Sequence, residues 1–166
     1  MKKQIEKMFN SIYEEYDLIN NFITFGQHKN WKKQIVDISK SLNPKRVLDV
    51  ATGTADIAIA LTKIKNCEII GMDLSSNMLE IGQKKIKELH LHKNVKLELG
   101  DVENLEYKDN YFDVVTVGYG VRNFENLKKS LDEIYRVLKK NGTLVILETL
   151  TLIHISEPTR RSVISY

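Results

Sequence analysis

The sequence lacks the features of several protein classes. Cys67 is the single cysteine, so a disulfide framework or a thiolate metal site within one chain is excluded. No apolar run is long enough to cross a membrane, because Glu148 interrupts the longest candidate, residues 144–155. Residues 1–6 are mostly polar and do not resemble the apolar centre of a signal peptide. We therefore expect a cytoplasmic protein.

An excess of one charge is also missing. The formal net charge is only +3, and no compact basic patch is interleaved with aromatic residues, so nucleic acid is not expected as a partner. The His, Asp and Glu residues show no metal-site spacing, and His90, His92 and His154 are expected at the surface or in the tail. A length of 166 residues with 42% hydrophobic residues suits one domain with one core.

The most informative stretch spans residues 46–56. A short apolar run, residues 47–50, leads into a turn of small residues, and a helical pattern starts at Asp56. Small residues let the backbone approach a ligand closely, and a helix N-terminus offers free N–H groups. Asp73 closes the next apolar run, twenty residues after Gly53, where a doubly wound fold places the carboxylate that binds a ribose. The stretch predicts a nucleoside-cofactor site.

The charges of this stretch bear on the kind of cofactor. The glycine positions of the dinucleotide fingerprint hold Ala51, Gly53 and Asp56 here. A carboxylate at the third position would repel a pyrophosphate bound at the helix N-terminus. S-adenosylmethionine carries no phosphate, and Asp49 at the end of the first strand can face its ammonium group. The alternative is that Asp56 is an ordinary first-turn helix acid in an ordinary tight turn.

Strand-like and helix-like segments alternate along the chain. The spacing of apolar residues predicts helices over residues 4–16, 31–41, 75–90 and 126–138, and strands over residues 68–72, 94–99, 111–117 and 143–147. This alternation is typical of an α/β fold with a parallel sheet, in which ligands bind at the carboxyl ends of the strands. That rule brings Asp49, Asp73, Asp101 and the loop over residues 118–123 to one edge of the sheet.

Two segments carry a family resemblance. One is residues 16–20 (YDLIN), followed by Ile23, Thr24, His28 and Trp31, and the other is residues 119–124 (YGVRNF). Together with the turn described above, the stretch from about residue 9 to residue 148 resembles the ubiquinone/menaquinone biosynthesis C-methyltransferases (the UbiE/MenG type). These are class I S-adenosylmethionine-dependent methyltransferases, so the resemblance implies a Rossmann-like three-layer sandwich. Residues 139–142 depart from the family pattern, but only in a turn.

The resemblance implies how the cofactor is held. Thr54 would contact the methionine end, Asp73 the ribose diol and Asp101 the adenine amino group. Val102 would pack against the base, and Gly118 would lie beneath the sulfonium. The expected cofactor-binding residues are Asp49, Gly53, Thr54, Asp73, Asp101, Val102 and Gly118. The cofactor is then S-adenosylmethionine, its product is S-adenosylhomocysteine, and no metal is required because the sulfonium methyl group is already electrophilic.

The resemblance also implies the acceptor, a ring carbon of a polyprenylated quinol precursor. Demethylmenaquinol is the first choice and the benzoquinol precursor of ubiquinone the second. The reduced ring reacts best when its hydroxyl, with a pKa of about 10, loses a proton. Arg122 could stabilise the phenolate and Asn123 could orient the hydroxyl or a water. Tyr16 and His28 are candidate proton acceptors or positioning groups, and a polar cap is the alternative for His28.

Two other functions remain open for the chain as a whole. One is a small-molecule methyltransferase with a different acceptor. The other is a catalytically silent nucleoside-binding module. Arg122 and Asn123 argue against silence, because a pure binding module has no evident need for them.

The resemblance divides the chain into three parts. Residues 1–42 are expected to form an N-terminal helical lid and acceptor segment, and residues 43–149 the S-adenosylmethionine-binding domain. Lysines of the first part predict a weak encounter with a membrane surface that holds the polyprenylated substrate. They are Lys2, Lys3, Lys7, Lys29, Lys32 and Lys33. The alternative is an ordinary core face with solvated lysines opposite it.

The third part, residues 150–166, has no family character. Members of the family continue after the fifth strand with a helix and two more strands. We therefore expect strands one to five to be present, the last two strands of the sheet to be missing, and the fifth strand to be an exposed edge. A chain with such an edge is expected to aggregate and to lack activity. The oligomeric state does not follow from these patterns.

Overall fold

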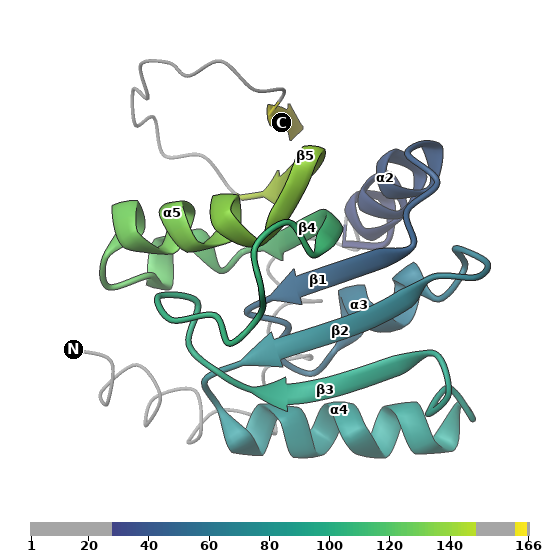
Figure 1. The fold of residues 1–166 in the computed structure, drawn as a ribbon. Coiled ribbons are helices and arrows are strands. Elements are labelled where there is room, and N and C mark those ends of the chain that lie inside the picture. The colour runs from purple at the N-terminus through teal and green to yellow at the C-terminus, as the bar shows by residue number, and fades with distance from the viewer. Residues whose placement is uncertain (1–27, 149–161, 166) are drawn as a thin grey trace.

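The computed structural model describes residues 28–148 and 162–165 (Figure 1). Its strands are β1 Arg46–Val50, β2 Glu68–Asp73, β3 Val95–Leu99, β4 Phe112–Gly118, β5 Leu138–Leu147 and β6 Ser162–Ser165. They form one sheet in the order β3-β2-β1-β4-β5-β6, with every neighbouring pair parallel. The helices are α2 His28–Ser41, α3 Asp56–Leu61, α4 Ser76–Glu88 and α5 Leu127–Val137, and a 3-10 turn, η1 Val121–Asn123, follows β4. The predicted α/β fold with a parallel sheet is confirmed.

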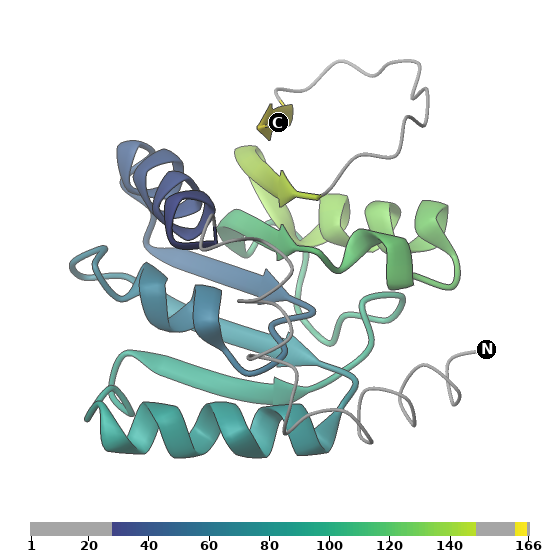
Figure 2. The same cartoon turned by 180° about the vertical axis from the view of Figure 1, so that it is seen from behind.

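Alternate residues of the central strand β1 face two helical layers. Val47 is buried in a core with residues of α2, α3 and α4, which cover one face of the sheet. Leu48 and Val50 are buried in a second core with residues of α5 on the other face. Because parallel strands are apolar on both faces, the sheet needs a cover on each side. The result is the expected three-layer sandwich, seen from opposite sides in Figures 1 and 2.

Side-chain caps set the starts of α4 and α5. The Ser75 hydroxyl accepts a hydrogen bond from the Met78 N–H at 3.3 Å, and the Asn126 amide oxygen accepts one from the Lys129 N–H at 3.0 Å. Each cap satisfies an N–H group that has no partner within its own helix. Both helices therefore begin where the sequence predicted.

Helix α2 belongs to the layer that covers the sheet. The helix predicted over residues 31–41 is confirmed and begins earlier, at His28. Ile35 and Val36 are 2% and 4% exposed and lie in the same core as α3. The helix predicted over residues 4–16 lies outside the described residues.

Strand β5 is longer than predicted, since it starts at Leu138 rather than at residue 143. Leu138 pairs with Phe112 at the start of β4, and the ladder is then irregular until it resumes at Thr143. Asn141 has a φ of 69° within the irregular part. Asparagine tolerates this left-handed conformation better than most residues. The predicted Asn-Gly turn is therefore a bulge inside the strand.

The expectation that β5 forms an exposed edge is wrong. β6 pairs with β5 in parallel, from Ser162 opposite Leu144 to Ser165 opposite Leu147. Val163 and Ile164 are β-branched and favour an extended strand. The outer side of β5 offers N–H and C=O groups with which a neighbouring strand can pair. The tail thus supplies a sixth strand that the family resemblance did not predict.

Candidate functional site

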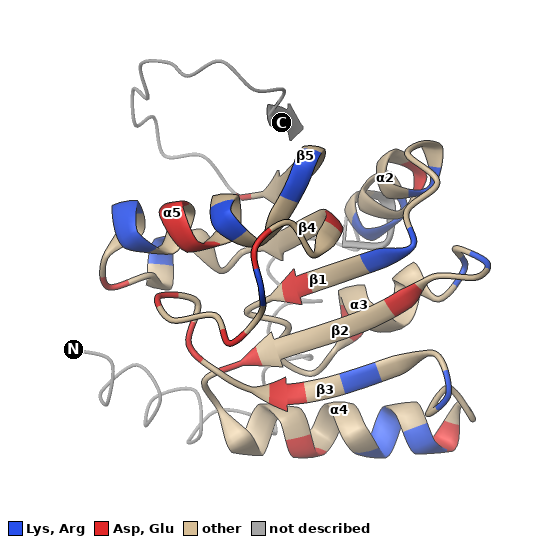
Figure 3. Ribbon diagram, viewed as in Figure 1, with Lys and Arg blue, Asp and Glu red and all other residues tan. Residues whose placement is uncertain are grey.

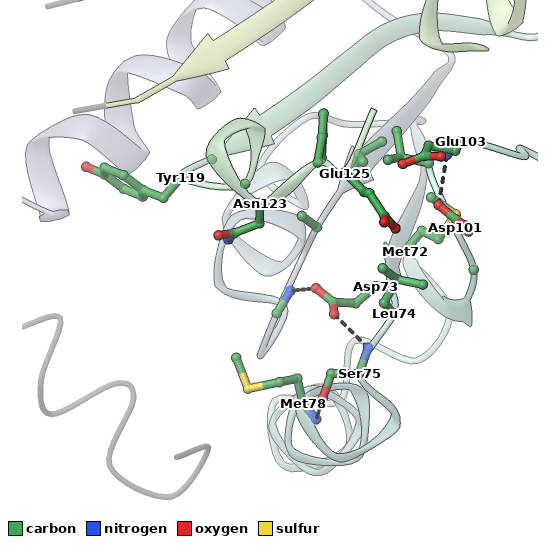
Figure 4. Close-up of a pocket in the computed structure, with 18 residues that line it drawn as sticks. Met72, Asp73, Leu74, Ser75, Met78, Asp101, Glu103, Tyr119, Asn123 and Glu125 are labelled. Carbon is green, nitrogen blue, oxygen red and sulfur yellow. Dashed lines mark hydrogen bonds between the residues drawn. The ribbon is translucent and has the colours of Figure 1, made fainter. Parts of the chain in front are cut away.

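A cavity lies at the carboxyl ends of the central strands (Figure 4). Its lining includes four carboxylates, those of Asp73, Asp101, Glu103 and Glu125. It also includes the apolar residues Val50, Met72, Leu74, Met78, Val102 and Phe124. Figure 3 shows acidic residues near the carboxyl ends of β1, β2 and β3. A cavity that is both acidic and apolar favours a ligand that combines cationic groups with apolar surface.

The lining residues define two ends of the cavity. In Figure 4, Asp101 and Glu103 lie at one end, Tyr119 and Asn123 lie at the other, and Asp73 lies between them. The first end is built by the loop after β3, and the second by the loop after β4. We call them the β3 end and the β4 end.

Asp73, the last residue of β2, joins the turn after β1 to the start of α4. Its carboxylate accepts hydrogen bonds from the Gly53 N–H at 2.8 Å and from the Ser75 N–H at 2.9 Å (Figure 4). Burial raises the pKa of Asp73, although these backbone donors oppose the shift. The contact joins Asp73 to the glycine turn after β1, while the binding of a ribose by Asp73 stays a prediction.

The turn after β1 has an uncommon backbone. Ala51, Gly53 and Ala55 have φ values of 54°, 57° and 66°. Left-handed conformations cost non-glycine residues about 1–2 kcal/mol each, so the surrounding contacts must hold this turn. The Thr52 N–H donates to the Met72 carbonyl at 3.0 Å, and the Ala55 N–H donates to the Thr52 carbonyl at 2.9 Å.

Asp49 lies beneath this turn and does not line the cavity. Its carboxylate is fully buried and accepts hydrogen bonds from the hydroxyls of Thr52 and Thr116, both at 2.6 Å. Burial raises the pKa of Asp49 to about 6, although the two threonine hydroxyls oppose the shift. The expectation that Asp49 faces the ammonium group of a ligand in the cavity is therefore not met by this arrangement. Asp49 instead connects the turn to β4.

Asp56 does not line the cavity and takes part in a cluster of ion pairs. Its carboxylate pairs with the ammonium groups of Lys32 from α2 and, at 3.0 Å, Lys85 from α4. Lys85 also donates to the Thr54 hydroxyl at 2.8 Å. Burial opposes ionisation, but the two lysines hold the pKa of Asp56 below its ordinary value.

This cluster corrects one argument from the sequence. Asp56 was expected to disfavour a pyrophosphate through its negative charge, but Lys32 and Lys85 neutralise that charge, and Asp56 does not line the cavity. The negative charge in the cavity comes instead from the four lining carboxylates. The side chain of Thr54 also faces Lys85 rather than the cavity.

Hydrogen bonds hold the loop that forms the β3 end against α5 and the residue before it. The Asp101 carboxylate accepts the Glu103 N–H at 2.9 Å, and Glu103 accepts the Asn126 N–H at 2.9 Å. Arg136 of α5 donates to the carbonyls of Leu105 and Tyr107, each at 2.7 Å. These bonds fix the loop against α5, so Asp101 and its neighbour Val102 are held at the cavity.

Glycines allow close backbone approach at the β4 end. A Cβ on Gly118 would lie 2.2 Å from Ile57 Cδ1, and one on Gly120 would lie 2.6 Å from the Cβ of Ala51. Tyr119, between them, has a φ of 57° and donates its N–H to the Leu147 carbonyl at 2.8 Å. The loop is thereby packed against the turn after β1 and against β5.

Aromatic and charged groups border the β4 end. The Tyr119 ring lies 6.0 Å from the Trp31 ring, centroid to centroid. Burial, followed by the charge of Glu148, raises the pKa of Tyr119 to about 12, and Arg122 opposes the shift. Arg122 lies 3.5 Å from Glu148, Nη1 to Oε1, and does not line the cavity, whereas Asn123 does.

The structure brings most of the expected cofactor residues together. Those that line the cavity are Gly53, Asp73, Asp101, Val102 and Gly118, and Asn123, which was expected to act in catalysis, lines it as well. Asp49, Thr54 and Arg122 lie near it but not on its lining. Tyr16 is outside the described residues, and His28 is described only as the first residue of α2.

Sequence reasoning did not single out Glu103, Glu125 or Tyr119 as lining residues, nor Glu148 as a partner of Arg122. Tyr119 directly follows β4 and Glu103 lies in the loop after β3, and this position at the carboxyl ends of strands is a signal that could have found them. The pairing of Arg122 with Glu148 depends on the adjacency of β4 and β5, which no local pattern contains.

Between residues 28 and 148 and in β6, no group of three or more His, Cys, Asp or Glu side chains is placed to hold a metal ion. No described helix is long and apolar enough to cross a membrane.

Comparison with known proteins decides the family. The sequence profile of the ubiE/COQ5 methyltransferase family matches residues 1–159. The chain belongs to this family. The match covers both predicted signature segments, so the family resemblance stated from those residues is confirmed.

Curated relatives support the same assignment. Demethylmenaquinone methyltransferases from Staphylococcus saprophyticus and Thermotoga maritima are 42% and 43% identical over 160 and 150 residues. The alignments cover 95% and 90% of this chain but only 65% and 63% of those relatives. The chain therefore spans slightly less than two thirds of the length of these proteins.

Solved structures share the fold. The YcgJ protein of Bacillus subtilis superposes with a TM-score of 0.65 at 28% identity, over 69% of this chain and 48% of that protein. A SAM-dependent methyltransferase of Aquifex aeolicus superposes with a TM-score of 0.63 at 23% identity, over 74% of this chain and 67% of that protein. The predicted Rossmann-like methyltransferase fold is confirmed.

Proposed function

We propose that the chain is an S-adenosylmethionine-dependent C-methyltransferase that acts on the reduced ring of a polyprenylated quinone precursor, with demethylmenaquinol as the preferred acceptor. The observation that carries this proposal is the acidic cavity at the carboxyl edge of the sheet. It occurs in a chain of the ubiE/COQ5 methyltransferase family. Relatives at 40–43% identity that are named demethylmenaquinone methyltransferases support the choice of acceptor.

The lining residues fit S-adenosylmethionine. Asp73 would accept hydrogen bonds from the ribose hydroxyls, because each carboxylate oxygen has lone pairs beyond the one used by its backbone donor. Asp101 would accept from the adenine amino group, and Val102, which is 6% exposed, would pack against the base. When bound, the cofactor supplies an electrophilic methyl group on a sulfonium. Asp49 and Thr54 would contribute through the turn that their contacts hold.

Acceptor activation is proposed for the β4 end. Asn123 lines the cavity there and would orient the acceptor hydroxyl or a water. The positive charge of Arg122 would stabilise a phenolate. Because its pKa is raised to about 12, Tyr119 stays protonated near neutral pH and would donate a hydrogen bond rather than accept a proton.

The N-terminal segment is proposed to complete the acceptor site as a lid and to meet the membrane surface weakly through its lysines. Most of this segment lies outside the described residues. One of its lysines, Lys32, pairs with Asp56, so it is less suited to a membrane contact than the exposed Lys33. Deletion of residues 1–27 is expected to abolish methylation and to spare part of the cofactor affinity. Undiminished quinol turnover in this deletion would refute the lid.

A methyl-transfer assay tests the proposed function. The chain, and a chimera that continues after Glu148 with the C-terminal part of the Staphylococcus saprophyticus relative, are supplied with S-adenosylmethionine and demethylmenaquinone. The chimera is included because the chain covers 65% of that relative. Methylated product is expected with the reduced acceptor and not with the oxidised one. Tighter binding of NADH than of S-adenosylhomocysteine would contradict the proposal, as would absence of transfer to any quinol in both proteins.

A further inference from the structure

An ion pair links the loop after β4 to the end of β5. Arg122 lies in η1, and Glu148 directly follows β5. Their side chains approach to 3.5 Å, Nη1 to Oε1, with 57% of the Arg122 side chain and 17% of the Glu148 side chain exposed. The arginine is therefore largely in solvent, while the carboxylate is largely enclosed.

The backbone on both sides of this pair is held in place. The Tyr119 N–H donates to the Leu147 carbonyl at 2.8 Å, immediately before Glu148. The Asn123 N–H donates to the Gly120 carbonyl at 2.9 Å, which closes η1 around Arg122. Side chains anchored on such fixed backbone keep a more precise geometry than side chains on free loops.

Both charges act on Tyr119, a residue of the cavity lining. Tyr119 is one of the residues that line the β4 end. Burial, followed by the negative charge of Glu148, raises the pKa of the Tyr119 phenol, and the positive charge of Arg122 lowers it. The pair is thus electrostatically coupled to the part of the cavity where the proposed acceptor binds.

We propose that Glu148 is a positioning residue whose carboxylate holds the Arg122 guanidinium at the β4 end, with its positive charge toward the acceptor oxygen. This inference rests on the proposed function. At 3.5 Å the carboxylate attracts the guanidinium and favours the orientation that keeps the two charges together. Because 57% of the Arg122 side chain is exposed, the guanidinium can turn toward solvent, and we expect the main effect of losing the Glu148 charge to be on the orientation of Arg122.

Four variants of the active protein, chain or chimera, test the role. They are Glu148→Gln, Arg122→Ala, the double variant, and the control Glu68→Gln. The control breaks the Arg46–Glu68 pair of 3.3 Å, whose side chains are 39% and 54% exposed, at the opposite end of the sheet. We expect Glu148→Gln to lower kcat by about tenfold or more and to leave S-adenosylhomocysteine affinity within about twofold. The control is expected to change neither.

The double variant tests whether the two residues act as one unit. Because Arg122→Ala already removes the guanidinium, the added loss of Glu148 should slow it no further. Additive losses would overturn the inference. So would an unchanged kcat in Glu148→Gln, or a cofactor affinity that falls as much as kcat.

A spectroscopic readout is independent of turnover. The NMR signal of the Arg122 guanidinium, assigned by its absence in Arg122→Lys, is expected to shift in Glu148→Gln and not in Glu68→Gln. An unmoved signal would overturn the inference. If the unmodified protein transfers no methyl group to any quinol, the proposed function fails and this inference fails with it. A normal unmodified enzyme with an equally active Glu148→Gln variant refutes the positioning role alone.

Discussion

Asp49 combines complete burial with two short hydrogen bonds from threonine hydroxyls. Its pKa in the folded protein is raised from 3.8 to about 6, so the folded state binds this proton more tightly than the unfolded state does. The resulting stabilisation is fully present below pH 3.8, is lost as the pH rises through 6, and stays lost above it. By linkage, the free energy of unfolding at neutral pH, where Asp49 is ionised, is lower by about 3 kcal/mol than it would be with the carboxyl group protonated.

Replacing Asp49 with asparagine tests this argument. The amide keeps the shape and can bond to both hydroxyls of Thr52 and Thr116, but it carries no charge. The variant is expected to have a higher free energy of unfolding than the parent at pH 8, by about 1–3 kcal/mol, and an equal one near pH 4. Urea unfolding across this pH range measures the difference. A variant that is less stable at pH 8 would contradict the assigned penalty.

Asp73 is expected to matter for binding more than for stability. Asp73→Ala removes the proposed ribose acceptor, and a hydrogen bond to a charged group contributes roughly 1.5–3 kcal/mol. We therefore expect S-adenosylhomocysteine affinity to fall by about one to two orders of magnitude in calorimetric titration. Asp132→Asn, an exposed carboxylate paired with Lys128, serves as the control. An unchanged affinity in Asp73→Ala would exclude Asp73 from the cofactor site.

At the scale of elements, α5 is connected to the loop that carries Asp101. Arg136 bonds to the carbonyls of Leu105 and Tyr107, so Arg136→Met leaves both without this donor. We expect the free energy of unfolding to fall by about 1–3 kcal/mol and S-adenosylhomocysteine to bind more weakly. Lys128→Met on the same helix breaks only an exposed pair with Asp132 and is expected to change neither. Normal cofactor affinity in Arg136→Met would show that α5 does not brace the adenine end of the site.

The elements themselves were largely predictable, because their signals are local. Apolar runs, helical spacings of apolar residues and the small-residue turn lie within short windows, and each marked a strand, a helix or the site. The directions of the side chains could not be predicted from such short windows. Asp49 faces Thr116, which is 67 residues away, and Thr54 meets Lys85, 31 residues away. Local patterns place a residue at an edge of the sheet, but remote partners decide where its side chain points.

At the scale of the molecule, β6 was the unexpected part. Its pairing with β5 depends on backbone hydrogen bonds, and proline has no N–H to donate. We expect Val163→Pro/Ile164→Pro to uncover β5 and to increase self-association of the chain, measured by sedimentation. The threonine pair, Val163→Thr/Ile164→Thr, keeps the strand propensity and is expected to stay as dispersed as the parent. Equal dispersion of the proline variant would show that β6 does not protect β5.

The contact between Trp31 and Tyr119 has an optical consequence. Trp31 is the single tryptophan of the chain, and its ring lies 6.0 Å from the ring that borders the β4 end. Its fluorescence therefore reports on one place in the molecule, without the overlapping signals of other indoles. A quinone bound at the β4 end would accept the excitation of this indole and quench its emission. Titrations of the unlabelled chain that follow Trp31 emission would therefore report directly on binding at the proposed acceptor site.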